Sequence, residues 1–136
     1  MFTRALFILA FIPSQVAADG AEIYADHCAD CHGLNLEGEP EWRTQKVDGS
    51  YPAPPHDDEG HTWHHSDGVL FDYVRLGGAE MLKRIGVSSV RSGMPAFDEI
   101  LTDDEIVQVL DFIKSEWSPR SRNYQRNISE NSEKSK

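Results

Sequence analysis

The sequence predicts a small all-α fold, because three stretches have helical spacing and no stretch alternates as a β-strand would. The clearest stretch opens with a capping box, in which Thr102 is the N-cap and Glu105 follows three residues later. Apolar residues then recur on one helical face: Ile106, Leu110, Ile113 and Trp117. Pro119 is expected to stop this helix, because proline cannot continue the backbone hydrogen bonding.

Two further helices and one long loop complete the expected fold. The first helix is expected over about residues 19–29, and the second runs from the N-cap residue Ser66 to Gly77 and Gly78. Between them, residues 33–65 are rich in Gly, Pro and Asp and predict an irregular segment. A loop of this length suits a compact domain only if it wraps a large bound group that serves as core.

Residues 1–18 and residues 118–136 differ in composition from the segment between them. Residues 1–18 are typical of an export signal, with Arg4 before an apolar run over residues 5–12 and small residues up to Ala18. Eight apolar residues are too few to span about 30 Å of hydrocarbon, which argues against a membrane anchor. We therefore expect a signal peptide over 1–18, one domain over 19–117, and a polar, disordered tail over 118–136. An uncleaved signal would leave the protein tethered.

The charge distribution excludes one class of partner. Residues 19–117 contain 7 Lys and Arg against 21 Asp and Glu, a net charge of −14, whereas residues 118–136 have a net charge of +3. Nucleic-acid binding needs a basic surface, so the acidic body argues against it. The negative charge favours solubility and could also steer the protein towards a basic partner surface.

The only two cysteines lie in the sequence HCADCHG, residues 27–33. A thioredoxin-type pair would accompany a βαβ pattern, and structural zinc would need further ligands, commonly a second cysteine pair; the sequence has neither. C-x-x-C-H is instead the attachment signature of c-type haem, in which each thiol forms a thioether and the adjacent imidazole binds iron. Cys28 and Cys31 are therefore predicted to hold one haem c covalently, with His32 as an iron ligand.

With these motifs the sequence resembles the class I c-type cytochromes, and within them the small bacterial monohaem cytochromes c. The resemblance covers about residues 19–117, with Gly20 and Tyr24 in the first helix, the cysteine motif, the segment SGMPAF at 92–97, and the amphipathic last helix. It implies the small cytochrome c fold, with three or more helices and a long irregular loop around one covalently bound haem. It also implies that the first and last helices cross, with Gly20 and Tyr24 against the face of Ile106, Leu110 and Ile113.

The sixth iron ligand is predicted to be Met94, which lies in a Gly-Met-Pro sequence that resembles the axial methionine loop of the family. Met81 is the other methionine of residues 19–136 and is expected to pack near the haem edge. Two alternatives involve the histidines of the long loop, which could replace Met94 or bind a second metal such as copper or zinc. These histidines are His56, His61, His64 and His65.

Together, the resemblance and the export signal imply a periplasmic electron-transfer protein rather than an enzyme. His/Met ligation would fill both axial positions, so that the protein shuttles single electrons between membrane or periplasmic oxidoreductases. One alternative is an enzyme with peroxidase or nitrite chemistry, if Met94 does not bind the iron. A second alternative is a metal chaperone or sensor that uses the loop histidines. No stable membrane insertion is expected if the signal is cleaved.

Overall fold

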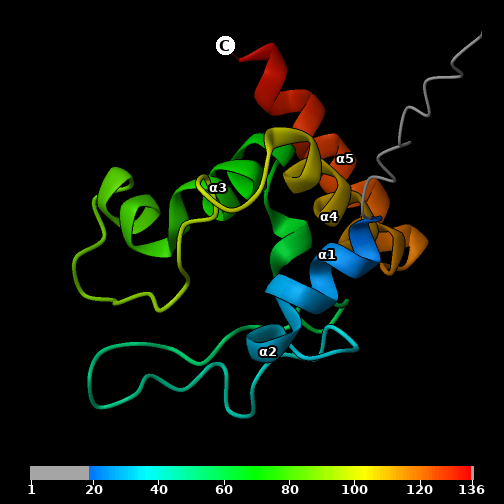
Figure 1. Cartoon of the computed structure of the whole chain (residues 1–136). Helices are drawn as coiled ribbons and strands as arrows, with labels where there is room; N and C mark the ends of the chain where they lie inside the picture. Colours follow the sequence, from blue (N-terminus) through cyan, green and yellow to red (C-terminus); the bar gives the residue numbers. More distant parts are fainter. Residues whose placement is uncertain (1–18, 136) are drawn as a thin grey trace, which may run out of the picture.

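The computed structural model describes residues 19–135 of the protein, and the regular elements of this part of the chain are helices joined by irregular loops (Figure 1). The elements are α1 (Gly20–His27), α2 (Ala29–His32), the 3-10 helix η1 (Thr62–His64), α3 (Asp67–Arg84), α4 (Asp103–Ser115) and α5 (Pro119–Lys134). The only β-type pairing among the described residues is an isolated bridge between Ser50 and Arg91. The predicted all-α class is confirmed.

The helix that the sequence predicts over about residues 19–29 corresponds to α1, and a second short helix, α2, follows it. The Asp19 side chain caps α1 by accepting a hydrogen bond from the backbone N–H of Glu22, at 2.9 Å. At Cys28 the backbone turns to φ −119°, which separates the two helices. Helix α2 then presents Cys31 and His32 before Gly33 ends it with φ +80°.

Helix α1 crosses α4 at close range, as the resemblance implied. A Cβ atom on Gly20 would collide with the backbone carbonyl of Gln108 and approach Cβ of Phe112 at 2.9 Å, so only glycine fits this crossing. The ring of Tyr24 lies 5.4 Å from that of Phe112. The atoms nearest to Gly20 thus belong to Gln108 and Phe112, and Tyr24 shares the core cluster with Ile106, Leu110 and Ile113, as expected.

The predicted apolar face of α4 lies in the main core. The capping box is present as expected, with Thr102 and Glu105 exchanging hydrogen bonds. Ile106 is fully buried at 0% exposure, and the core cluster joins α1, α3, α4 and the loop before α4. Its buried members include Ile23, Tyr24, Leu70, Phe97, Leu101, Ile106, Val109, Leu110, Ile113 and Trp117.

Helix α3 continues beyond the glycines at which the sequence predicts its end. Gly77 has φ +77° and ψ 161°, which kinks the chain, and a second helical section then runs to Arg84. At the kink, Gly77 lies against the loop that precedes α4. A Cβ atom on Gly77 would lie 2.7 Å from the backbone N of Ala96 in that loop. Gly77 therefore breaks the helix and admits the loop, but it does not end the helical segment.

The expectation of a disordered tail over residues 118–136 is wrong for Pro119–Lys134, which forms α5. Ser118 caps this helix and Pro119 occupies its first turn, where no backbone N–H is needed. Polar side chains form its buried face: Ser121, Gln125 and Ser129. Gln125 donates to the backbone oxygen of His65 at 3.2 Å. Polar side chains hold α5 against the rest of the fold, so a search of the sequence for an apolar helical face does not detect this helix.

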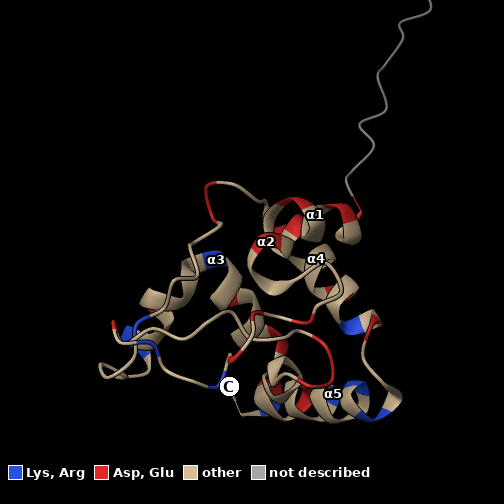
Figure 2. Cartoon of the chain, turned by 90° about the horizontal axis from the view of Figure 1, so that it is seen from below, with Lys and Arg blue, Asp and Glu red and all other residues tan. Residues whose placement is uncertain are grey.

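The loop over residues 33–65 is irregular, as predicted, except for η1, and it extends on the side of α2 (Figure 1). Within residues 19–135, none of the helices combines the length and the apolar content that crossing a membrane requires. The predicted signal peptide, residues 1–18, lies outside the described residues. The charged residues of α1 and α2 are acidic, whereas basic residues outnumber acidic ones along α5 (Figure 2).

Candidate functional site

The two thiols of the cysteine motif lie at the junction of α1 and α2. Both are free: Cys28 is partly buried and Cys31 is exposed. Burial, followed by the proximity of Cys31, raises the pKa of the Cys28 thiol to about 11. Redox-active C-x-x-C pairs have lowered thiol pKa values, so this environment does not suit disulfide exchange. Two unpaired thiols three residues apart do suit attachment to a common group.

The imidazole of His32 is buried and held by one hydrogen bond. Its Nδ1 lies 2.8 Å from the carbonyl oxygen of Pro54, and because a carbonyl only accepts, Nδ1 carries the proton. Burial lowers the pKa of His32, which favours the neutral ring. The lone pair of Nε2 is therefore available for a metal. The carbonyl that holds the ring thus comes from Pro54, in the long loop.

Met94 lies in the loop between α3 and α4, and two backbone hydrogen bonds hold it. Its carbonyl accepts from the N–H of Gly78 at 3.1 Å, and its own N–H donates to Ser92 Oγ at 3.2 Å. The side chain is partly buried and packs against the core cluster. Met81 is 6% exposed on α3, as its expected packing role requires.

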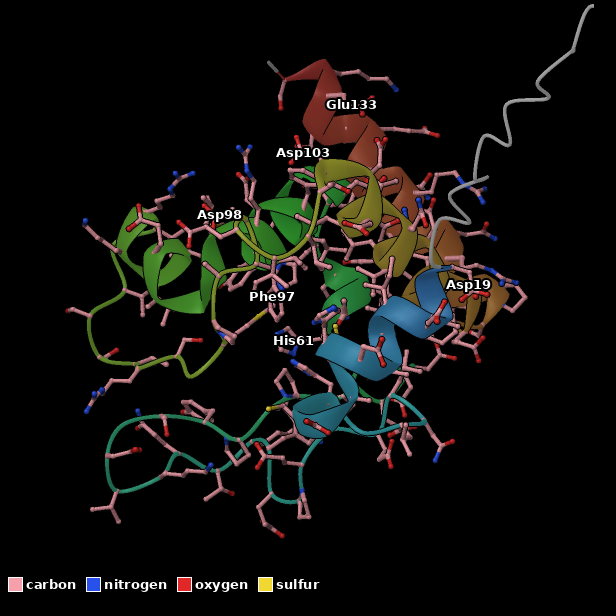
Figure 3. All side chains as sticks on the ribbon, in the orientation of Figure 1. Asp19, His61, Phe97, Asp98, Asp103 and Glu133 are labelled. Carbon is pink, nitrogen blue, oxygen red and sulfur yellow. The ribbon has the colours of Figure 1, made fainter. Side chains whose placement is uncertain are left out.

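The loop of Met94 also reaches the end of α1 that precedes Cys28. The ring of Phe97 lies 6.3 Å from that of His27, in an edge-on arrangement. Phe97 is fixed to α3 because its N–H donates to the carbonyl of Val74 at 3.1 Å. Figure 3 shows the side chains of Phe97 and His61 in the space between α1 and α3. The Met94 loop and the cysteine motif thus belong to one region of the fold.

The four loop histidines pack mainly against different partners, and only His61 and His65 approach each other, edge-on at 5.5 Å. The ring of His56 stacks on His32, His61 stacks on Trp42 at 5.7 Å, and His64 packs edge-on against Trp63 at 3.8 Å. Among residues 19–135, no three or more His, Cys, Asp or Glu side chains are grouped to hold a metal ion. The geometry therefore gives no support to a second metal site.

Burial controls the charge of these histidines. It lowers the pKa of His56 well below the usual value, with smaller contributions from His32 and His61, so the ring of His56 is neutral near pH 7. Burial also lowers the pKa values of His61 and His65. The indole N–H of Trp63 donates to the backbone oxygen of Asp58 at 3.3 Å.

Two residues of this region carry contacts that the sequence did not indicate. Pro54 and His56 reach His32 from 22 and 24 positions along the chain, and no local spacing rule relates such residues. A third contact joins the Tyr24 hydroxyl to the carbonyl of Gly33 at 2.9 Å, directly after the attachment motif. The packing of the long loop against α1 and α2 creates the first two contacts.

Comparison with protein families identifies the class. The family model for cytochrome c matches residues 17–117, and the chain belongs to the cytochrome c family. No curated protein matched the sequence, and no solved structure matched it either. Helix α5 lies beyond the matched region.

Proteins of this family bind haem c covalently and generally transfer electrons to redox partners. The residues of this chain fit such a group, because two free thiols stand beside a neutral imidazole whose Nε2 is available. The family assignment thus supports haem-based electron transfer as the general function.

Proposed function

We propose that this protein is a periplasmic carrier of single electrons with one haem c. Thioether bonds from Cys28 and Cys31 attach the haem, and His32 and Met94 are its axial ligands. The observation that carries the proposal is the hydrogen bond from His32 Nδ1 to the carbonyl of Pro54, at 2.8 Å. It orients a neutral imidazole with Nε2 free, directly after the second thiol.

Methionine is proposed as the second axial ligand because its loop is held in the same region as the thiols. The thioether is a weak ligand that raises the reduction potential of His/Met haem sites. When bound, the haem supplies a metal centre that accepts and releases one electron. With both axial positions filled, a substrate finds no open coordination site, which supports a carrier and not an enzyme.

The surface and the first residues support the remaining parts of the proposal. The acidic charge of residues 19–117 suits encounter with basic patches on membrane or periplasmic oxidoreductases, and redox encounters use small interfaces. Residues 1–18 have the pattern of an export signal, which directs the chain to the periplasm where c-type haem is attached. Cell fractionation, with and without residues 1–18, tests this location.

The ligation is tested with Met94→Leu and its matched control Met81→Leu, both produced in cells that attach c-type haem. Absorption spectra of the oxidised and reduced forms are recorded with and without carbon monoxide. The wild type and Met81→Leu should be low-spin, keep the methionine–iron charge-transfer band, and resist carbon monoxide. Met94→Leu should lose that band and bind carbon monoxide when reduced. An unchanged spectrum in Met94→Leu would refute ligation by this residue.

A further inference from the structure

A second imidazole lies face to face with the proposed iron ligand. The ring centroids of His56 and His32 are 3.9 Å apart, and the ring planes differ by 22°. The Tyr24 ring approaches His56 edge-on at 6.4 Å, from another side. His56 therefore lies between Tyr24 and His32, and its face covers one face of the His32 imidazole.

Three hydrogen bonds fix His56 in this place. Its backbone N–H donates to the carbonyl of Leu36 at 2.8 Å, and its backbone oxygen accepts from the indole N–H of Trp117 at 2.6 Å. Its ring Nδ1 lies 2.8 Å from the hydroxyl of buried Thr62. Trp117, which follows α4, is 2% exposed, so this anchor is itself part of the buried core. The ring can neither slide along nor turn away from His32 without breaking one of these bonds.

The hydrogen bond to Pro54 restrains only one edge of the His32 ring. A hydrogen bond at Nδ1 fixes the tautomer and orients that edge of the ring, and a stacked partner adds a restraint on the tilt of the ring plane. Stacking also has an electronic effect, since the face of a neutral aromatic ring carries partial negative charge. That face stabilises a neighbouring ring best when the neighbour carries more positive charge, as an imidazole bound to ferric iron does.

We propose that His56 is a positioning residue for His32, which sets the plane of the axial imidazole and lowers the reduction potential of the iron. This inference rests on the proposed function, because it takes His32 as an iron ligand. It goes beyond that function in assigning a role to a residue outside the ligand set. The His56 side chain acts through His32 and through no contact with a redox partner.

The test compares three substitutions in the protein with haem attached. His56→Leu removes the aromatic face at a similar volume, His56→Phe keeps the face and loses the bond to Thr62, and Thr62→Val keeps His56 and releases its Nδ1. Midpoint potentials are measured by spectroelectrochemistry. The paramagnetic proton NMR spectrum of the ferric form reports the orientation of the axial imidazole plane.

His56→Leu should raise the potential, so that at a fixed electrode potential the ratio of ferrous to ferric protein increases by about threefold, the size of a modest aromatic-pair effect. Its pattern of paramagnetic shifts should change as well. His56→Phe should stay close to the wild-type potential, and Thr62→Val should alter the shift pattern. If His56→Leu does not retain haem, Thr62→Val decides the positioning role, because a shift pattern identical to that of the wild type would overturn it.

Equal midpoint potentials in the wild type and His56→Leu would overturn the proposal. Identical paramagnetic NMR shift patterns in His56→Leu and His56→Phe would overturn it as well. A loss of stability without a change in potential or NMR pattern would make His56 a packing residue only. The wild-type spectrum separates this failure from failure of the proposed function. Low-spin iron with His/Met features leaves the function intact, whereas a wild type without such features would overturn both.

Discussion

Replacing Gly20 by alanine tests the helix crossing that supports the attachment site. The added Cβ would collide with the backbone carbonyl of Gln108, which is part of α4 and cannot rotate away as a side chain would. To make room, α1 must move off α4, and the contacts of Ile23 and Tyr24 in the core would loosen. Forcing extra atoms into a packed contact costs about 1–3 kcal/mol.

Gly68→Ala provides the matched control. Gly68 also lies in the first turn of a helix, α3, and a Cβ there would meet no heavy atom within 4 Å. Both substitutions reduce the freedom of the unfolded chain by a similar amount, worth about 0.4–1 kcal/mol. This contribution cancels in the comparison, so the difference between the two variants measures the clash alone.

The free energies of unfolding would be measured by denaturant titration of the protein with haem attached. Gly68→Ala should be as stable as the wild type or slightly more stable, and Gly20→Ala should be less stable than Gly68→Ala by about 1–3 kcal/mol. For a domain of this size, each kcal/mol lowers the melting temperature by roughly 4–8 °C. Equal stability of the two variants would refute the close crossing of α1 and α4.

Tyr24→Phe removes the hydroxyl that donates to the carbonyl of Gly33, so unfolding should become easier by about 0.5–1.5 kcal/mol in a denaturant titration, and an unchanged midpoint would contradict this hydrogen bond. Asp58→Asn tests the docking of α5, because hydrogen bonds from Ser121 and Ser118 lower the pKa of the Asp58 carboxyl in the folded protein. A lowered pKa adds stability that is present above the unfolded value of 3.8 and is lost as the pH falls through the folded value. The wild type should therefore have a higher melting temperature than Asp58→Asn at pH 6, and this difference should disappear as the pH falls below about 3.8. A difference that does not change with pH would show that the charge of the Asp58 carboxylate does not stabilise the fold.

Local sequence rules predicted the parts of the site that are close together in the chain. The spacing of Cys28, Cys31 and His32 requires only one helical turn, and the capping box at Thr102 requires only the first turn of α4. Such features depend on neighbouring residues, and a single sequence contains them in full. The crossing of α1 and α4 followed from the family resemblance, whereas the closest approach of Gly20 to the carbonyl of Gln108 did not.

Contacts between distant segments were not predictable in the same way. Pro54 and His56 meet His32 because the long loop folds back under α2, and no periodicity relates residues so far apart. Helix α5 was expected to be disordered because its buried side chains, including Gln125, are polar. Such side chains stabilise a helix only when partners from elsewhere in the fold satisfy their hydrogen bonds, and the sequence does not show those partners.

The retention of haem by the unfolded chain tests covalent attachment most directly. The protein matured in a haem-attaching periplasm is denatured and extracted with acidified organic solvent, and the haem content and mass of the chain are then measured. We predict one haem per wild-type chain after extraction, and none on a Cys28→Ser, Cys31→Ser double variant. Release of haem from the wild type, or its retention by the double variant, would contradict attachment through these two thiols.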